Sequence, residues 1–313
     1  MKKRLLTMSL LALVALAGCG TKEPAESTES ADVPVVKVGV MPSTDNMPLI
    51  VAHEQGFDKK HGVEIDLQTF KSGKDRDAAF QSGAVDGINA DLVGVAAYLQ
   101  GGMDVKITSA TYGQFDLIAP SDIQSVSELK GKDVIVLKNQ GPEYAVDKIL
   151  EKSEMSNADV SIVDVPQVPS RVELLQNNQA AAAILPEPFV TMTKSQGMTN
   201  LGSTRDIGLN PFVLCFTDDV IEEKSEALQG MYDAYNEAVD WMKNNDKSAY
   251  IQLFIDEIGF PETLKDEIKV PDYPHASPAT EDDIVSAFDW AKEKGILKTE
   301  IQPKDVLSDV YFK

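Results

Sequence analysis

Residues 63–100, VEIDLQTFKSGKDRDAAFQSGAVDGINADLVGVAAYLQ, decide the fold because they alternate strand-like and helix-like segments. The pattern predicts strands over 63–70 and 84–88, and helices over 75–82 and 92–100. Strands separated by helices form βαβ units, in which neighbouring strands run parallel. This stretch therefore predicts an α/β protein with a mixed, mostly parallel sheet.

The same alternation extends in both directions from this stretch. Before it, 35–40 has the pattern of a strand, and Pro48 suits the first turn of a helix reaching about residue 55. Beyond it we predict strands at 105–111, 115–119, 134–136, 160–165 and 180–185, and helices at 143–152 and near 170–177. The last third is mainly helical, over 222–244, 247–258 and 281–294.

An internal repetition supports two related lobes. Shifting 70–93 by ninety-five positions places Arg76 on Arg171 and Gln81 on Gln176. Each half then has the same order of strand, loop, helix, turn, strand and loop. The length of the chain also allows two domains.

The beginning of the chain has the pattern of a secretory signal peptide, 1–18. A basic start at residues 2–4 precedes an uncharged run at 5–17, shorter than the roughly 20 apolar residues that span a bilayer. The quartet LAGC, which ends at Cys19, resembles the lipobox of bacterial lipoproteins. The resemblance implies cleavage before Cys19, acylation of that residue and anchoring outside the cytoplasm to the cell membrane. The alternative is an ordinary signal peptide with a chance cysteine.

These features predict the following organisation. Residues 19–33 form a lipid anchor and a polar tether that cannot bury enough apolar surface to fold. Lobe one comprises 34–111 and 213–313, and lobe two comprises 112–212. The chain crosses between the lobes twice, in strands expected near 111–115 and 210–216.

Composition limits the partners of the protein. The chain has 29 basic and 50 acidic residues and a formal net charge of −21, which argues against binding nucleic acid. Besides Cys19 there is one cysteine, Cys215, in an apolar run. We expect a buried packing thiol there, the alternative being a reactive nucleophile.

In open α/β sheets, ligands bind beyond the carboxyl ends of the strands, among the loops that lead into helices. These loops provide the ligand-binding candidates Thr44, Asp45, Asn46, Ser72, Gly73, Asn89, Asp91, Gln140, Gly141 and Glu187. Prolines on both sides of Glu187 restrict its backbone, so we expect its carboxylate to point into the cleft. Aromatic candidates for stacking on a flat ligand are Tyr112, Tyr144, Phe189 and Phe212. The alternatives are capped turns for the loops and core packing for the rings.

Several short motifs, taken in order, resemble a known family. They are PLIVAHEQGF at 48–57, KHGVEI at 60–65, QSGAVDGI at 81–88, SELKGK at 127–132 and EPF at 187–189. The family is that of periplasmic-type binding proteins for ABC importers, in the branch handling sulfonates, taurine, nitrate and thiamine pyrimidine precursors. The resemblance implies a type II binding fold, in which two α/β lobes close over a small-molecule ligand, and an ABC permease as partner.

The chain departs from the family in two places. The second lobe usually carries a Gly-x-x-Asp-Ala pattern, whereas residues 178–182 here read NQAAA. Yeast pyrimidine synthases on this fold carry a cysteine-rich motif, which is absent from this sequence. The first departure weakens a substrate assignment by analogy, and the second means that the chemistry of those synthases is not implied.

The sequence lacks the usual signatures of an enzyme. It has no Gly-x-Ser-x-Gly elbow, P-loop or His-Glu-x-x-His helix, and His53, His61 and His275 do not have metal-ligand spacing. Asp45 and Asp91 could act as acid and base, but no nucleophile accompanies them. We therefore expect neither catalysis nor a cofactor or metal; the alternatives are an enzyme or a ligand-presenting sensor on the same fold.

Taken together, these features predict a monomeric solute-binding lipoprotein of an ABC importer. Carboxylates in three loops, at Asp45, Asp91 and Glu187, favour a ligand with N–H donors, such as an aminopyrimidine or related thiamine precursor. Lys71, Lys74 and the helix opened by Gly141 favour the alternative, a sulfonate or taurine-type oxyanion.

Overall fold

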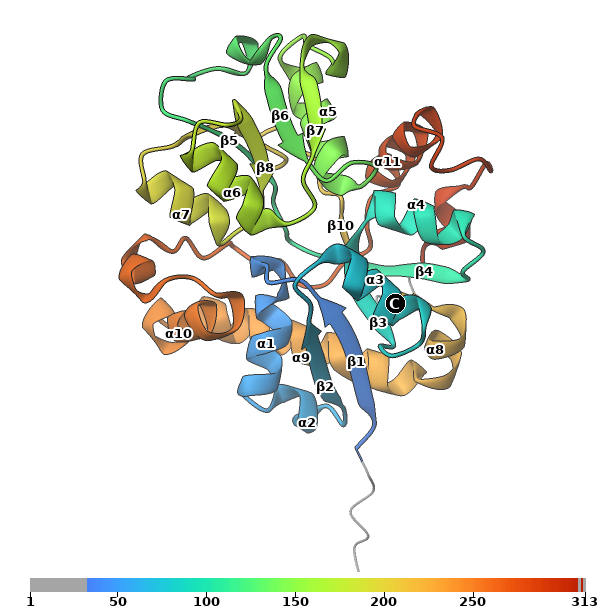
Figure 1. The fold of residues 1–313 in the computed structure, drawn as a ribbon. Helices are drawn as coiled ribbons and strands as arrows, with labels where there is room; N and C mark the ends of the chain where they lie inside the picture. The colour runs from blue at the N-terminus through green and yellow to red at the C-terminus, as the bar shows by residue number, and fades with distance from the viewer. Residues whose placement is uncertain (1–32, 309–310, 312–313) are drawn as a thin grey trace, which may run out of the picture. The chain divides into compact units, whose positions relative to one another are not determined.

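Two five-stranded mixed sheets form the framework of the protein (Figure 1). The computed structural model describes residues 33–308 and 311, so the predicted signal peptide and Cys19, the predicted site of lipid attachment, lie outside the described residues. The first sheet, in the order β2-β1-β3-β10-β4, contains β1 (Val35–Val40), β2 (Glu64–Thr69), β3 (Gly87–Asp91), β4 (Val105–Ala110) and β10 (Phe212–Thr217). The second, in the order β7-β6-β8-β5-β9, contains β5 (Asp116–Ala119), β6 (Asp133–Val136), β7 (Ser161–Asp164), β8 (Ala182–Leu185) and β9 (Thr199–Ser203).

The two sheets have the same arrangement of strands. In the first, β1 pairs in parallel with β2 and β3, and β10 runs antiparallel between β3 and β4. In the second, β6 pairs in parallel with β7 and β8, and β5 runs antiparallel between β8 and β9. Each sheet therefore contains one strand, β10 or β5, that enters after the chain has crossed from the other sheet.

Helices cover the sheets. They are α1 (Met47–Glu54), α2 (Phe57–Lys60), α3 (Gly73–Gln81), α4 (Leu92–Gln100), α5 (Gly141–Lys152), α6 (Val168–Gln176), α7 (Phe189–Ser195), α8 (Asp218–Glu223), α9 (Ser225–Asn244), α10 (Ile251–Leu253), α11 (Glu281–Glu293) and α12 (Pro303–Val306). Within the described part of the chain, none of them combines the length and apolarity needed to cross a membrane.

The alternation of side chains along β10 shows how the first sheet is buried on both faces. Leu214 and Phe216 pack in the cluster beneath α1 and α9, whereas Val213 and Cys215 pack in the cluster beneath α4 and α11. Successive side chains of a strand point to opposite faces, so a strand buried on both faces reads as a continuous apolar run. Cys215 is fully buried, as expected of a packing thiol.

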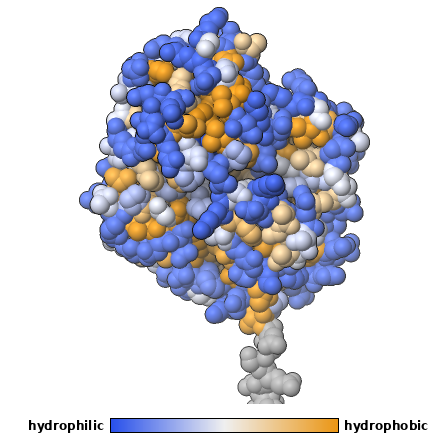
Figure 2. Space-filling model, in the orientation of Figure 1, coloured by the Kyte–Doolittle hydropathy of each residue, from blue (hydrophilic) through white to orange (hydrophobic). Residues whose placement is uncertain are grey.

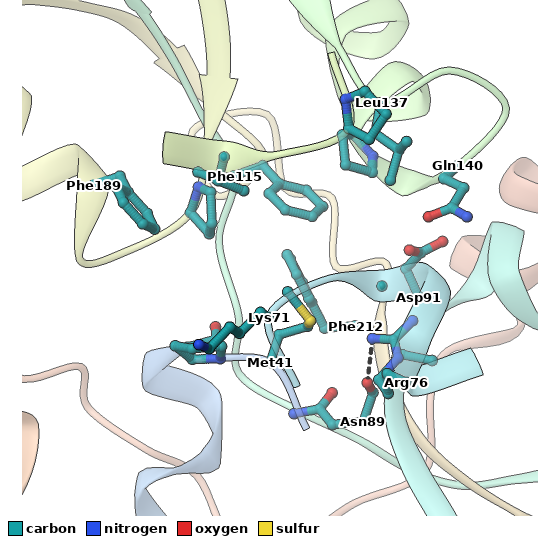
Figure 3. A pocket seen from close by; sticks show the side chains of 18 of the residues that line it. Met41, Lys71, Arg76, Asn89, Asp91, Phe115, Leu137, Gln140, Phe189 and Phe212 are labelled. Carbon is teal, nitrogen blue, oxygen red and sulfur yellow. Dashed lines mark hydrogen bonds between the residues drawn. The ribbon is translucent and has the colours of Figure 1, made fainter. Parts of the chain in front are cut away.

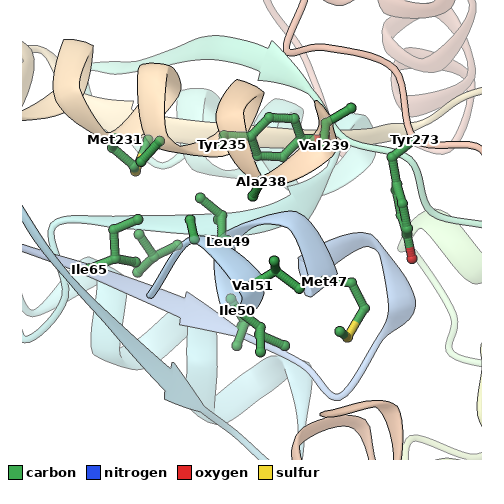
Figure 4. Packing of buried hydrophobic residues seen from close by; sticks show 14 of the residues in the cluster. Met47, Leu49, Ile50, Val51, Ile65, Met231, Tyr235, Ala238, Val239 and Tyr273 are labelled. Atoms are coloured by element: carbon green, nitrogen blue, oxygen red, sulfur yellow. The ribbon is translucent and has the colours of Figure 1, made fainter. Parts of the chain in front are cut away.

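Apolar residues of α1 and α9 form the core on one face of the first sheet (Figure 4). Leu49 and Val51 of α1 lie with Tyr235 and Val239 of α9, and each is almost completely buried. Met47 begins α1, and the preceding residues 44–46 form a short 3-10 helix. This packing fixes the loop between β1 and α1, which contributes to the cavity described below.

The internal repetition corresponds to equivalent elements. α3 and α6 are both nine residues long and begin ninety-five positions apart, at Gly73 and Val168. Both contain the repeated pair, Arg76 with Gln81 in α3 and Arg171 with Gln176 in α6. Strands β1–β4 and β10 belong to one sheet and β5–β9 to the other; the exact lobe boundaries, 34–111 with 213–313 and 112–212, stay a proposal.

Three predicted elements differ from the structure. Residues 111–115 cross between the sheets without forming a strand, so this crossing is irregular, whereas 212–217 is the strand β10. The predicted helix at 222–244 is divided at Lys224, whose ammonium group bonds the Val35 carbonyl (2.9 Å) and Asp86 (2.7 Å). The predicted helix at 247–258 consists of a 3-10 turn, a short α segment and a π segment that ends at Gly259, with φ +91°. At Lys224 these tertiary contacts override a local helix pattern.

Candidate ligand-binding cavity

Loops from both sheets enclose a cavity of about 370 Å³. The first-sheet wall comes from segments within 41–46, 71–76 and 89–91, and the second-sheet wall from segments within 137–142, 166–171 and 186–189. Phe115 and Phe212, which flank the two crossings, also line it (Figure 3). Figure 2 shows a hollow in this face of the molecule with strongly hydrophilic side chains at its rim. These are the loops at the carboxyl ends of the parallel strands, where the topology predicts a ligand.

Asp45 lines this cavity and has a buried carboxylate. Its side chain is 2 % exposed, and its Oδ2 accepts hydrogen bonds from Asn89 Nδ2 (2.8 Å) and Thr111 Oγ1 (3.0 Å). Its Oδ1 is buried without a hydrogen-bond partner in the described part of the protein. An unsatisfied buried acceptor costs about 1–3 kcal/mol, more when it is charged, so a donor at this position would be stabilising.

A hydrogen-bond network holds Asp45 in place. Asn89 Nδ2 also donates to Asn46 Oδ1 (2.7 Å), and Asn46 Nδ2 donates to the carbonyl of Met41 (2.7 Å). Tyr273 Oη donates to the carbonyl of Thr44 (2.6 Å), which fixes the loop from the outside. The carboxylate is therefore oriented before any ligand binds, as a recognition group requires.

Asp91, on the first-sheet wall, lies against Gly141 at the start of α5. Its Oδ1 caps α4 by accepting from the N–H groups of Val93 and Gly94, both at 3.0 Å. Burial raises the pKa of this carboxyl, and the two backbone bonds and Arg76 oppose that shift. A Cβ atom at Gly141, the first residue of α5, would lie 2.5 Å from Asp91 Cγ. Only glycine allows this approach of α5 to the first-sheet wall.

Two equivalent arginines lie on opposite walls. Arg76 Nη1 donates to the carbonyl of Asn89 in β3 (2.7 Å; Figure 3), and Arg171 Nη1 donates to the carbonyl of Ile184 in β8 (3.0 Å). In each case the acceptor lies thirteen residues after the arginine. The repeated arginine therefore has the same task in both halves, which is to bind the end of the central strand to the preceding helix.

The rest of the lining is mainly apolar. Phe115 and Phe212 pack with ring centroids 4.7 Å apart, and Met41, Leu137 and Phe189 add further apolar surface (Figure 3). A small-molecule pocket commonly combines an apolar lining with a few fixed polar groups. The cavity has this composition.

The predicted site residues fall into three groups. Those that line the cavity are Asp45, Asn46, Gly73, Asn89, Asp91, Gln140 and Phe212. Those next to it are Thr44, whose carbonyl holds Tyr273, Ser72, which caps α3 through Asp75, and Gly141, which contacts Asp91. Those whose side chains are engaged elsewhere are Tyr112, Tyr144 and Glu187.

The structure corrects the expectation for Glu187. Its carboxylate accepts from the N–H of Thr191 (3.0 Å) and from Thr191 Oγ1 (2.9 Å), and it does not line the cavity. The side chain thus serves the first turn of α7, because free N–H groups there attract a carboxylate. Burial nevertheless raises its pKa, against the effect of these bonds.

The two tyrosines differ from expectation in the same way. Tyr144 is fully buried, donates to Ser286 Oγ (2.8 Å) and packs against Trp290 of α11. Tyr112 packs edge-on against Tyr273 and has the Arg205 guanidinium 4.3 Å from its ring centroid. Both rings therefore pack against other side chains of the protein, which was the alternative to stacking on a ligand.

Sequence reasoning missed several lining residues, including Phe115, Leu137 and the two arginines. The arginines carried a detectable signal, because they are the repeated pair. The apolar residues carried none, since an apolar side chain in a loop can equally belong to the core.

A model of the NMT1-like family matches residues 29–255. The chain belongs to this family. A Brachyspira hyodysenteriae protein whose name assigns it to ABC transporter periplasmic binding proteins is 22 % identical over 275 residues, covering 81 % of this chain and 78 % of that protein.

Solved structures share the fold of this NMT1-like protein. The aliphatic sulphonate binding protein SsuA of Escherichia coli superposes with a TM-score of 0.74 at 16 % identity, covering 88 % of this chain and 92 % of that one. The desulfurization enzyme DSZB superposes with a TM-score of 0.63 at 12 % identity, covering 89 % and 97 %. These comparisons confirm the resemblance to the importer-associated branch and the two-sheet periplasmic binding fold. The fold alone does not decide the function, because it occurs both in binding proteins and in an enzyme.

Proposed function

We propose that this protein is the solute-binding component of an ABC importer and that it captures a small molecule outside the cytoplasm. The family, the fold and the name of the Brachyspira relative support this function. The observation that carries it is the cavity between loops of two sheets, whose lining includes the buried carboxylate of Asp45, one oxygen of which has no hydrogen-bond partner among the described residues. Binding, followed by transfer to a permease, needs only such a pre-formed site.

The proposed ligand has N–H donors on a flat or apolar body, as an aminopyrimidine or related thiamine precursor does. Asp45 would accept an N–H, and a ring would lie among the phenylalanines Phe115, Phe189 and Phe212. The second candidate, a sulfonate, is favoured by Lys71 at the rim. It is disfavoured near α5, because the Asp91 carboxylate already lies against Gly141 at the start of that helix.

Catalysis has less support from the described residues. Cys215 is buried beside the carbonyl of Ile88, and burial raises the pKa of its thiol to about 12, so it is not an accessible thiolate. His53, His61 and His275 pair with Asp58, Glu237 and Asp240, and none of the three lines the cavity. A ligand-presenting sensor would bind the same ligand as an importer component. The two functions differ in whether a permease accepts the ligand from this protein.

A thermal-shift panel tests the proposed ligand class. A compound at a hundred times its dissociation constant adds about 2.7 kcal/mol to the free energy of unfolding. For a chain of this size that corresponds to a rise of roughly 5–11 °C in Tm. We expect an aminopyrimidine to produce this shift without being converted, and alkanesulfonates not to. A panel in which only sulfonates raise the Tm would contradict the proposed ligand.

Asp45→Asn should lower the affinity for that aminopyrimidine by about 10–100-fold. The change keeps the shape but removes the charge, and a hydrogen bond to a charged group contributes about 1.5–3 kcal/mol. Calorimetry on this variant should be compared with Asp233→Asn, which removes the same charge from the exposed side of α9. Equal affinities in the two variants would exclude Asp45 from ligand recognition.

We expect membrane anchoring through Cys19. Cells fed a labelled fatty acid should incorporate it into the wild-type protein and not into Cys19→Ala, because the thiol is the proposed acylation site. The variant should also be released from the membrane fraction. Label retained on Cys19→Ala would show that any acylation lies elsewhere. The monomeric state is likewise a proposal, which sedimentation can measure.

A further inference from the structure

Helix α5 contributes to the buried core on both sides of the cavity. Its residues Ala145, Val146 and Ile149 lie in the cluster that contains residues of β5, β6 and β8 in the second sheet. Tyr144, in contrast, is fully buried in the cluster formed by α4, α11 and strands of the first sheet. One helix of the second-sheet side therefore packs into the core of the first-sheet side.

Polar contacts join α5 to α11 around this tyrosine. Tyr144 Oη donates to Ser286 Oγ (2.8 Å), and the indole Nε1 of Trp290 donates to Asp147 Oδ2. The rings of Tyr144 and Trp290 pack edge-on, with centroids 5.6 Å apart. α11 in turn packs on α4, which covers the first sheet (Figure 1). These contacts therefore connect the second-sheet side of the protein to the first-sheet side.

Lys294, at the end of α11, supplies the positive charge of this contact. Its ammonium group lies 2.8 Å from Glu143 Oε1, 3.4 Å from Asp147 Oδ2 and 5.0 Å from the ring centroid of Trp290. Glu143 and Asp147 are both buried. Burial raises the pKa of Asp147, and the bond from Trp290 and the charge of Lys294 oppose that shift. Without Lys294 the two buried carboxylates would lie together with no cation, which is costly.

The α5–α11 contact, as we call it, lies outside the cavity. None of its members is among the residues that line the cavity, so the contact needs no ligand atom. These members are Glu143, Tyr144, Asp147, Ser286, Trp290 and Lys294.

The chain connects the two sheets only loosely beside this contact. The connecting segments are 111–115 and 204–211, and neither contains a regular helix or strand. Irregular segments of this kind can absorb a rotation of one packed unit relative to another. A non-covalent contact between the two sides then decides how far apart the cavity walls lie.

We propose that the α5–α11 contact holds the two cavity walls together independently of a ligand and thereby sets the fraction of the protein that is closed. A ligand has to enter between the walls, so an open arrangement must also be populated. The apparent dissociation constant of a ligand that binds only one arrangement equals its intrinsic value divided by the fraction in that arrangement. The α5–α11 contact is therefore a conformational control of affinity that does not touch the ligand.

Lys294→Glu tests this proposal, and Lys292→Glu is its matched control. The two lysine side chains are 28 % and 27 % exposed and lie near the same end of α11. Lys292 pairs with Asp289 and Glu300, neither of which belongs to α5. Both variants make the same change of charge, but only Lys294→Glu places a third carboxylate between α11 and α5.

The separation of the cavity walls can be measured by pulsed electron paramagnetic resonance. Nitroxide labels at Lys74→Cys in α3 and Glu173→Cys in α6 occupy exposed positions on the two helices that line opposite walls. The labelled protein carries Cys19→Ala, so that Cys215, which is fully buried, is its one remaining native cysteine.

Without added ligand, we expect the distance between the labels to match this structure in the otherwise unchanged protein and in Lys292→Glu. In Lys294→Glu the distribution should shift to longer distances, because the third carboxylate repels α5. The same distance in Lys294→Glu and Lys292→Glu would overturn the proposal. A protein that is already open before any change to α11 would also overturn it.

A milder variant covers the case in which Lys294→Glu does not fold. Lys294→Met keeps an apolar stem over Trp290 but leaves Glu143 and Asp147 without their cation, so the distance should lengthen in the same direction. Adding Asp147→Asn removes one unpaired charge and keeps an acceptor for Trp290, so the distance should return toward that of the wild type. A merely structural lysine would lower the Tm without changing the distance in either variant, and this result would contradict the proposal.

Affinity for 4-aminopyrimidine separates this proposal from the proposed function. By calorimetry, Lys294→Glu should bind this probe about tenfold more weakly than Lys292→Glu, because less of the protein is closed. If 4-aminopyrimidine does not bind but the distances change as expected, the proposed ligand class fails and the control by the α5–α11 contact stands. If the probe binds both variants equally and their distances are the same, this control fails and the proposed function stands.

Discussion

Gly141→Val should reduce ligand affinity by at least 100-fold while the protein stays folded. A Cβ at this position would lie 2.5 Å from Asp91 Cγ and 2.6 Å from its Oδ2, and valine adds two more carbons beyond it. Asp91 cannot turn away cheaply, because its Oδ1 holds the first turn of α4. The α5 wall must therefore move away from the first-sheet wall, and the ligand loses contacts on one side of the cavity.

Calorimetry with the best compound of the thermal-shift panel measures this effect. Gly141→Ala provides a graded comparison and should give a smaller loss, because it adds one carbon. Far-UV circular dichroism should change little and the Tm without ligand should fall only modestly, because two of the buried clusters contain no residue of α4 or α5. Wild-type affinity in Gly141→Val would mean that the contact between Asp91 and α5 is not needed for binding.

Arg76→Gln should lower the free energy of unfolding by about 3–5 kcal/mol, the usual cost of removing one partner of a buried ion pair. The substitution leaves Asp77 without its cation and the carbonyl of Asn89 without its charged donor. For a chain of this size the Tm should fall by roughly 6–20 °C. Arg171→Gln should cost less, because it leaves carbonyls and no carboxylate without a partner.

A double-mutant cycle identifies the cause of this loss. Asp77→Asn in the Arg76→Gln background removes the unpaired charge, and the amide oxygen can still accept from Tyr98 Oη (2.7 Å in the wild type). We therefore expect the double variant to be more stable than Arg76→Gln alone. The loss in the double variant is then smaller than the sum of the two single losses, and the difference is the coupling energy of the pair. A purely additive result in urea unfolding would show that the pair is not coupled.

Much of the fold follows from local pattern. The repeated alternation of apolar strands with polar-faced helices predicts the order of elements, and the boundaries of α4 match the prediction at both ends. The rule that ligands bind beyond the carboxyl ends of strands also selects the correct loops, because that rule depends on chain direction alone. Asp45, Asn89 and Asp91 could be chosen in this way.

The direction of a side chain within a loop does not follow from local pattern. Glu187 follows a central strand and adjoins prolines, yet it bonds Thr191, because α7 begins immediately after it. Tyr144 is buried against Trp290, because α11, far along the chain, packs on α5. Which of several available partners a polar group takes depends on distant segments, and sequence spacing does not report them.

The sequence was sufficient for the α/β architecture and its repetition, since periodicity and strand order are local properties of the chain. Tertiary structure was required to distinguish the two repeated arginines. They are equivalent in sequence, and the difference between Asp77 and Val172 beside them is visible from the start. Its consequence depends on burial, because an exposed arginine needs no partner, whereas the buried Arg171 donates to three backbone carbonyls where Arg76 also has a carboxylate.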